Sequence, residues 1–403
     1  MIAGSVGDRP DIVRHPSGTE EGVLPVAAIY GANASGKTNV ILAMQFMSGA
    51  VKYSHARWEP DAAIELEPFA GDSDSPTTFS ADILLAGVRH QYGFSLSRDA
   101  VIEEWLFAYP LGKKQTWFAR EKDKPISFST KLQGDNRVIE RLTRPNSLFL
   151  SAAAQNNHET LTPVYRWFSQ SLSFVIGERA STMRAGSSLY RNIELQRRFV
   201  QLLSSADLGI TGLKVREAVM PDGAKEFASK LKELIRAEFK LDDDSIEPEN
   251  HEVEFMHRIG SSTIPFLEDQ ESKGTIAYLC LLDPVVRALT NGGVVCVDEL
   301  DDSLHPLLAI ELIRQFNDMR NNSTSAQLIF NTHDTNLLSA GVLRRDQIWF
   351  TEKRTDGASQ LYPLTDFKPR RQENLENGYL QGRYGAIPFL NPDCLLKAGH
   401  EEK

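Results

Sequence analysis

Three features are scarce or absent in this 403-residue sequence, and each argues against a class of protein. No apolar run approaches the ~20 residues of a membrane span, so we expect no membrane segment and no membrane partner. The first residues show no basic, apolar and small-residue leader, so export is not expected. Cysteine occurs only at Cys280, Cys296 and Cys394, a dispersed and odd set that is typical of the reducing cytoplasm rather than of a disulfide framework.

Basic side chains are also in the minority, because 44 Lys and Arg stand against 54 Asp and Glu and the formal net charge is −10. A chain whose whole surface neutralised nucleic-acid phosphates should be basic. Basic residues do gather at 113–124 and 191–198, but acidic residues are interleaved with them, which favours ordinary solvated surface. Nucleic-acid binding therefore stays open.

The pattern along the chain predicts an α/β protein with a β-rich part and a mainly helical part. Residues 1–22 are polar and predict a loose lead-in, whereas residues 76–109 alternate as in a strand hairpin or meander. From 135 to 245 the spacing is mainly helical, and from 252 helices and strands alternate to about 366. Within the helical part we expect helices at 161–176, 189–206 and 224–239, a strand at 208–220 and an acidic linker at 241–250.

The stretch AAIYGANASGKTNVI, residues 27–41, fits the phosphate-binding spacing G-x-x-x-x-G-K-[ST]. An apolar strand pattern precedes it and helical spacing follows it, which is the context that such a loop needs. Inward-pointing N–H groups and the helix N-terminus favour bound phosphate. We expect Lys37 to reach the β- and γ-phosphates of a nucleotide and Thr38 to bind Mg²⁺. The predicted phosphate-binding residues are Gly31, Asn33, Ser35, Gly36, Lys37 and Thr38.

Two later strands end in polar side chains that complete such a site. In GGVVCVDELDDSLHP, residues 292–306, a buried strand delivers Asp298 and Glu299 to its carboxyl end. Alone, this pair would favour a helix cap. In a chain with a phosphate-binding loop we expect Asp298 to hold Mg²⁺, directly or through water, and Glu299 to orient and deprotonate the attacking water. In QLIFNTHD, residues 327–334, His333 follows a second buried strand and suits a γ-phosphate sensor.

A third segment, LEDQESKGTIAYLCLLDPVV at residues 267–286, begins a long apolar helix. Ser272 should cap this helix, whose first N–H groups can face an anion. Capping alone explains the serine, so the phosphate role stays one of two interpretations here.

In this order the pieces resemble the ATP-binding cassette head of SMC, RecF and OLD type ATPases. GANASGKT matches the Walker A motif, ESKGT the signature, VVCVDE the Walker B motif, LDDSLHP the D-loop and NTHD the switch-histidine stretch. The resemblance narrows to the bacterial AAA15-type ATPases of abortive-infection and other anti-phage systems. It rests on AAIYGANASGKTNVI, DELDDSLHP, NTHDTNLL, RRDQIWF and the tail ENGYLQGRYGAIP, which span most of residues 26–388.

The resemblance implies an α/β fold: an ABC-type P-loop ATPase head, with a β-rich lobe and a parallel-sheet core, and a compact, mainly helical insertion. It further implies that Ser272 and Gly274 contact the γ-phosphate held by a second copy, that Asp301 couples the two sites, and that ATP clamps a homo-oligomer. The predicted parts are the lead-in at 1–22, the first part of the head at 23–134, the insertion at 135–250, the second part at 251–367 and a tail at 368–403.

The sequence shows no second catalytic constellation. We therefore expect this cytoplasmic ATPase to be the sensor or scaffold of an anti-phage system, with a phage-derived trigger and a separate effector protein, a nuclease or a toxin. A RecF-like DNA-repair ATPase and a slow binding module that ATP merely assembles are the alternatives.

The sequence departs from the family pattern in two places. Residues 1–22 lack the ENFRS-like strand that usually precedes the P-loop, which predicts a truncated or misassigned start. No glutamine is assigned to the Q-loop, because Gln45 falls in the P-loop helix and Gln91 in a strand. No chemistry is predicted for GYLQGRYGAIP.

Overall fold

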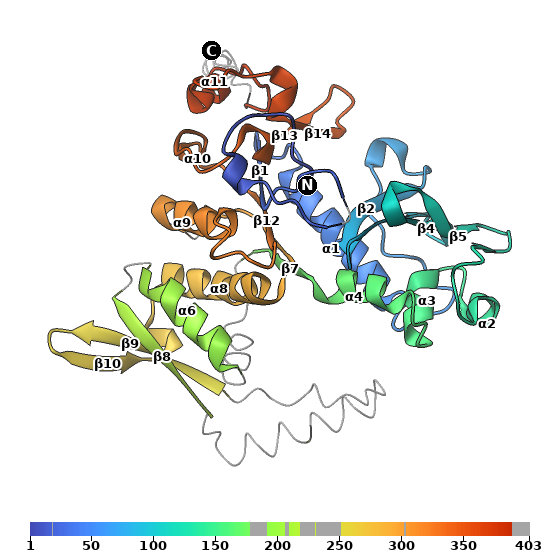
Figure 1. Ribbon diagram of the computed structural model, residues 1–403, viewed down its shortest axis with the longest axis horizontal. Coiled ribbons are helices and arrows are strands. Elements are labelled where there is room, and N and C mark those ends of the chain that lie inside the picture. The colour runs from blue at the N-terminus through green and yellow to red at the C-terminus, as the bar shows by residue number, and fades with distance from the viewer. Residues whose placement is uncertain are drawn as a thin grey trace, which may run out of the picture.

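The computed structural model of the chain describes residues 1–17, 19–177, 192–205, 209–217, 230, 251–301 and 304–388. These residues form three β-sheets with helices packed around them (Figure 1). Apart from Lys230, the helix expected at 224–239 and the linker at 241–250 lie outside the described residues, as does Cys394.

A six-stranded sheet forms the centre of the molecule, in the order β14-β13-β1-β12-β11-β7. Five strands are parallel, and β14 pairs antiparallel with β13 at one edge. Because β1 and β11 are buried along their whole length, their sequences are continuous apolar runs rather than alternating ones. The strands are β1 (Val26–Gly31), β7 (Leu172–Val175), β11 (Val294–Val297), β12 (Gln327–Asn331), β13 (Ile348–Lys353) and β14 (Ser359–Pro363).

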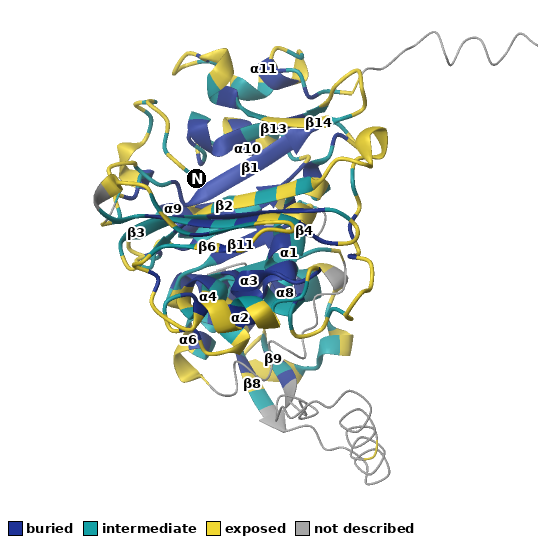
Figure 2. Ribbon diagram, turned by 90° about the vertical axis from the view of Figure 1, so that its right-hand side faces the viewer, coloured by how far each residue is buried: buried dark blue, intermediate teal, exposed yellow. Residues whose placement is uncertain are grey.

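Helices cover both faces of this sheet. Val295 and Val297 of β11 face a core that includes α8 (Lys273–Asn291) and α9 (Pro306–Asn317). The alternate residues, Val294 and Cys296, pack against Ile41 of α1 (Lys37–Tyr53) on the other face. The two short helices α10 (Asn336–Ser339) and α11 (Leu375–Leu380) follow later in the chain. Figure 2 shows β1 running through the buried interior.

A five-stranded antiparallel sheet, β2-β3-β4-β5-β6, lies beside the central sheet and confirms the predicted meander (Figure 1). Its inward side chains share a second core with α1, α3 and α4. The parts of this lobe are β2 (Thr77–Leu85), β3 (Val88–Leu96), β4 (Val101–Tyr109), β5 (Gln115–Glu121), β6 (Ser127–Phe128), α2 (Asn136–Leu142), α3 (Phe149–Gln155) and α4 (Thr162–Gln170).

The third sheet, β10-β9-β8, packs against α6. Within the described residues, helix α6 agrees with the prediction for 189–206 and β8 with the strand expected at 208–220. Strand β9 opens the part of the chain in which helices and strands were expected to alternate. The bounds are α6 (Ile193–Ser205), β8 (Ile210–Glu217), β9 (His251–Ile259) and β10 (Ser262–Phe266).

The helix expected over 161–176 is wrong in its second half. Helix α4 ends at Gln170, and Leu172–Val175 is β7, which pairs with β11 in the central sheet. The stretch LSFV fits both the helical and the strand spacing of apolar residues, and it forms a strand because it pairs with β11. A Cβ on Gly293 would lie 2.7 Å from the Ser171 carbonyl, so glycine permits this approach.

The lead-in is anchored rather than loose. Arg14 and Ile2 form antiparallel bridges with Val23, and Ile12 is fully buried. The buried guanidinium of Arg14 donates to the carbonyls of Phe316 and Asn317 at the end of α9. Arg14 therefore ties the lead-in to the core by hydrogen bonds.

Candidate nucleotide site

The loop between β1 and α1 holds the predicted phosphate-binding residues at the carboxyl end of β1. Lys37 is buried, and its Nζ donates to the carbonyls of Gly31 at 3.0 Å and Ala32 at 3.1 Å. Ala34 has φ +60° and Gly36 φ +105°, the left-handed backbone that bends such a loop. Asn33 is exposed in the loop.

Two contacts fix the loop to the β13–β14 hairpin. The Ser35 and Thr351 hydroxyls hydrogen-bond at 2.6 Å, and a Cβ on Gly31 would lie 2.4 Å from Thr351 Oγ1. A Cβ on Gly36 would lie 2.3 Å from Ser359 Oγ. Close packing therefore disfavours a side chain at either motif glycine, and the positive φ of Gly36 adds a second reason for glycine there.

The carboxylates after β11 lie within electrostatic reach of the loop lysine. Burial lowers the pKa of Lys37, while Glu299, Asp301 and Asp298 act in the opposite direction. The strand order explains the meeting, because β12 alone separates β1 from β11 and all three strands are parallel. The ends of β1 and β11 thus bring Lys37 and the three carboxylates to one edge of the sheet.

Asn331 at the end of β12 links the two acidic residues. Its side-chain amide donates to Asp298 Oδ1, and its Oδ1 accepts the backbone N–H of Glu299 at 2.5 Å. Glu299 has φ +56°, which is costly for a residue with a side chain and is held here by the bond to Asn331. The backbone conformation of Glu299 thus sets the direction of its exposed side chain. Sequence reasoning assigned no role to Asn331, although it is the first residue of NTHD.

On the sequence's prediction that the chain hydrolyses ATP, we expect Asn331→Ala to lower kcat about 10-fold or more, because Asp298 and Glu299 lose their common anchor. Stability should fall by about 1–3 kcal/mol, since buried groups lose their partners. Asn322→Ala is the matched control: Asn322 is also buried, but bonds Phe316 and Ala326 away from the site. Equal kcat losses in the two variants, measured with their melting temperatures, would contradict the positioning role.

Asp301 holds the loop that carries His333. Its Oδ1 accepts the Thr332 hydroxyl at 2.6 Å, and both its oxygens accept the backbone N–H of His333, at 3.1 and 3.2 Å. The His333 side chain is exposed. The D-loop and the switch-histidine stretch are thus joined within one chain.

The donor set fits Mg²⁺ without enclosing it. Thr38 is half-buried in the first turn of α1, and no group of the described residues hydrogen-bonds its hydroxyl. Asp298 uses one oxygen for Asn331, and no described residue donates to the other. Among the described residues no cluster of three or more His, Cys, Asp or Glu could hold a metal. Mg²⁺ typically binds through one or two protein oxygens together with substrate phosphates and water.

The signature segment is not joined to these groups. Ser272 caps α8: its Oγ accepts the N–H of Thr275 at 3.1 Å and lies 2.9 Å from the Thr275 hydroxyl. Ser272 and Gly274 are both exposed. The capping prediction is confirmed, and no hydrogen bond of the described residues connects Ser272 to the loop at 31–38.

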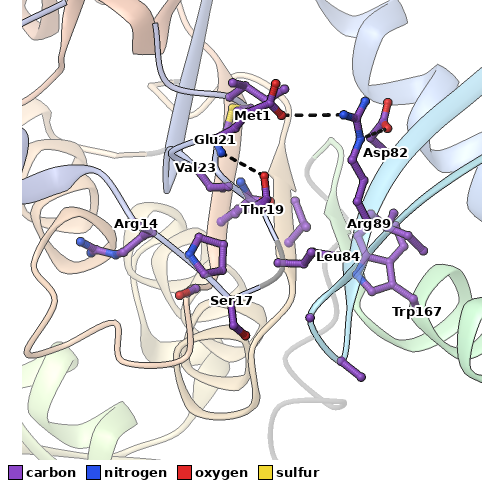
Figure 3. A pocket seen from close by; sticks show the side chains of 18 of the residues that line it. Met1, Arg14, Ser17, Thr19, Glu21, Val23, Asp82, Leu84, Arg89 and Trp167 are labelled. Carbon is purple, nitrogen blue, oxygen red and sulfur yellow. Dashed lines mark hydrogen bonds and ion pairs between the residues drawn. The ribbon is translucent and has the colours of Figure 1, made fainter. Parts of the chain in front are cut away.

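A cavity of about 430 Å³ lies at the opposite edge of the sheet, where β11 and β12 begin (Figure 3). Charged groups at this cavity pair with one another, because Arg89 contacts Asp82 at 2.7 Å and Glu21 at 3.8 Å. The buried guanidinium of Arg14 points away from the cavity to the carbonyls of α9. This cavity is separate from the candidate nucleotide site.

None of the helices in the described part of the chain has the length and apolar character needed to cross a membrane.

Comparison with known proteins gives one family. The family model described as "AAA domain, putative AbiEii toxin, Type IV TA system" matches residues 26–339, well over half of the chain. This range begins at β1 and includes every predicted site residue from Gly31 to His333. No curated protein matches the sequence significantly.

Solved structures similar to the chain include three SMC heads. The SMC head domain from Thermotoga maritima has 12% identity and a TM-score of 0.40, over 87% of this chain and 96% of that one. An SMC head bound to the C-terminal winged-helix domain of ScpA has 14% identity and a TM-score of 0.40, over 86% and 93%. A Pyrococcus furiosus SMC head with an extended coiled coil, bound to the C-terminal domain of ScpA, has 13% identity and a TM-score of 0.32. The match covers 86% of this chain and 92% of that one. A similarity this remote assigns no residue role or partner to the chain.

Proposed function

The chain belongs to the AAA domain family whose model it matches, and from this premise we propose that it hydrolyses Mg-ATP as a two-copy switch. Family and fold make it a P-loop, ABC-like ATPase domain of the α/β class. One observation carries the proposal of hydrolysis: Lys37, Asp298, Glu299 and the His333 loop lie at one edge of the sheet. The strand order β1-β12-β11 places them there, and hydrogen bonds join the ends of β11 and β12.

In the proposed reaction each residue has a separate task. Lys37 and the N–H groups of the loop bind the β- and γ-phosphate oxygens. Glu299 orients a water molecule and accepts its proton as the water oxygen attacks the γ-phosphorus and ADP leaves. His333 lies where it can contact the γ-phosphate. Thr38 and Asp298 would hold Mg²⁺, which would supply positive charge to neutralise the phosphate oxygens.

The signature segment belongs, in this proposal, to the site of a second copy. Ser272 and Gly274 are exposed at the N-terminus of the 19-residue helix α8, which can present N–H groups to a phosphate. They do not bond the loop of their own chain. Two copies related by a two-fold axis would each complete the other's site, and hydrolysis would remove the shared γ-phosphate contacts.

We expect Ser272→Asp to abolish ATP-dependent pairing while ATP still binds. Aspartate is a good N-cap, so α8 should remain intact, but its charge would repel the γ-phosphate of the partner site. The measurement is the mass in solution of Glu299→Gln and of Glu299→Gln/Ser272→Asp, each with and without Mg-ATP. Ser204→Asp on α6 is the control for added charge.

A dimer that forms with ATP only when Ser272 is present supports the two-copy site. If both proteins remain monomers with ATP bound, or if both pair equally, the signature role is wrong.

We further propose that this switch serves a defence system of the abortive-infection kind. The family description places the domain in a Type IV TA system and calls it a putative toxin, and such a system has more than one component, which supports a role beside another protein. The chain would be a cytoplasmic sensor or scaffold that holds or releases a separate nuclease or toxin in response to a phage-derived trigger. The buried Cys280 and Cys296 agree with a reducing compartment.

A further inference from the structure

The C-terminal segment, residues 373–388, packs into the central core next to the nucleotide site. Figure 1 shows α11 beside β13 and β14. Tyr379 and Tyr384 are buried, and each stacks with Phe350 of β13, at ring distances of 5.5 and 5.7 Å. The motif GYLQGRYGAIP, to which no chemistry was assigned, thus packs against β13.

The glycines of this segment allow the tyrosines to pack. A Cβ on Gly378 would lie 2.6 Å from the Tyr384 hydroxyl, and one on Gly385 would lie 2.8 Å from the Tyr362 hydroxyl. The Tyr362 hydroxyl donates to the Tyr384 carbonyl at 2.9 Å, which ties the segment to β14. Its conformation is therefore set by side-chain packing against β13 and β14.

Tyr379 connects the segment to the start of the phosphate loop. Its ring meets that of Tyr30 edge to face, at 5.8 Å between centroids, and Tyr30 directly precedes Gly31. Burial raises the pKa of Tyr379, and the Gly31 backbone N–H at its hydroxyl acts the other way. Tyr30 in turn donates its hydroxyl to the Asp334 carbonyl at 3.3 Å, one residue after His333.

Glu376 connects the same segment to the switch loop directly. The Thr335 hydroxyl donates to Glu376 Oε1 at 3.0 Å, and both side chains are half-buried. Although Thr335 is the N-cap residue of α10, its side chain makes no capping bond there. The Thr335 hydroxyl therefore bonds the C-terminal segment instead of capping its own helix.

We propose that Glu376 is a positioning residue for the loop that carries His333, so that the C-terminal segment is a working part of the nucleotide site. The loop from Asn331 to Thr335 is then held on three sides: by Asp301 at Thr332 and His333, by Tyr30 at Asp334, and by Glu376 at Thr335. Asp301 precedes the loop in the chain, whereas Glu376 lies 41 residues beyond Thr335. This inference rests on the proposed hydrolysis for its kinetic effect alone.

The test uses pairs of variants that differ in one hydrogen-bonding group. Thr335→Val removes the donor and Thr335→Ser keeps it, while Glu376→Ala removes the acceptor and Glu376→Gln keeps an oxygen. We expect Thr335→Val and Glu376→Ala to lower kcat about 10-fold with KM for ATP within two-fold, and Thr335→Ser and Glu376→Gln to retain most of the wild-type kcat. The double variant Thr335→Val/Glu376→Ala should be no slower than either single one, because both remove the same bond.

A second measurement is independent of turnover. Backbone amide exchange in the peptide covering residues 331–336 should quicken in Thr335→Val and Glu376→Ala and remain at the wild-type rate in the two conservative variants. Equal exchange in Thr335→Val and Thr335→Ser, or effects on kcat that multiply in the double variant, would overturn the proposal. If the wild type itself does not hydrolyse Mg-ATP, the proposed function fails, and amide exchange alone decides on Glu376.

Discussion

Replacing Glu299 with glutamine is expected to lower kcat for ATP hydrolysis about 1,000-fold while ATP binding is retained. The side chain keeps its size and one oxygen, but it can no longer accept the proton of the attacking water. The backbone at this position has φ +56° and is held by Asn331, so glutamine should occupy the same place. Phosphate release at saturating ATP and a separate ATP titration measure the two effects.

Glu67→Gln is the matched control, because it makes the same chemical change at a residue that is exposed between α1 and β2. Its kcat should equal that of the wild type. A Glu299→Gln protein that turns over within a few-fold of the wild type would show that another group activates the water. In a phage challenge of the native operon, the same substitution should remove any protection; unchanged protection would separate defence from hydrolysis.

Replacing Lys37 with methionine is expected to weaken ATP binding about 100-fold, or about 3 kcal/mol, through the loss of charge-assisted bonds to phosphate. Methionine keeps the length of the buried stem, and the lost bonds within the protein are those to the carbonyls of Gly31 and Ala32. Calorimetric titration with Mg-ATP gives the affinity, and a melting curve without nucleotide reports on the fold.

Lys52→Met is the control on the same helix, 15 residues on and about 22 Å along its axis. It should bind ATP as the wild type does. If Lys37→Met binds ATP with wild-type affinity, the loop does not hold the phosphates in the way proposed. If it fails to fold, Lys37→Arg, which keeps the charge, allows the affinity to be measured.

Much of the candidate site could be predicted because its signals are local. The phosphate loop needs a strand, eight residues of fixed spacing and a helix, and all of these are neighbours in the chain between 26 and 53. The polar residues after β11 and β12 could be predicted equally well, since each group follows a short run of buried apolar residues. The carboxyl ends of parallel strands lie at the same edge of a sheet, so the sequence indicated that these residues would lie close together.

Contacts between distant segments could not be predicted in this way. Asn331 bonds Glu299 across 32 residues, and Glu376 bonds Thr335 across 41. Neither pair has a spacing rule, because the distance along the chain depends on the loops between the elements. The strand at Leu172–Val175 was missed for a related reason: its partner β11 begins more than a hundred residues later.

The sequence by itself determined the loop between β1 and α1, the acidic pair after β11 and the helix cap at Ser272, because each depends on backbone geometry within a few residues. Only the tertiary structure decided that Asn331 sets the direction of Glu299, that the lead-in is anchored to α9, and that the C-terminal segment lies against β13 and the loop of His333. The physical reason is that buried hydrogen bonds and aromatic contacts form between surfaces that the fold brings together, and the order of strands in the sheet selects those surfaces.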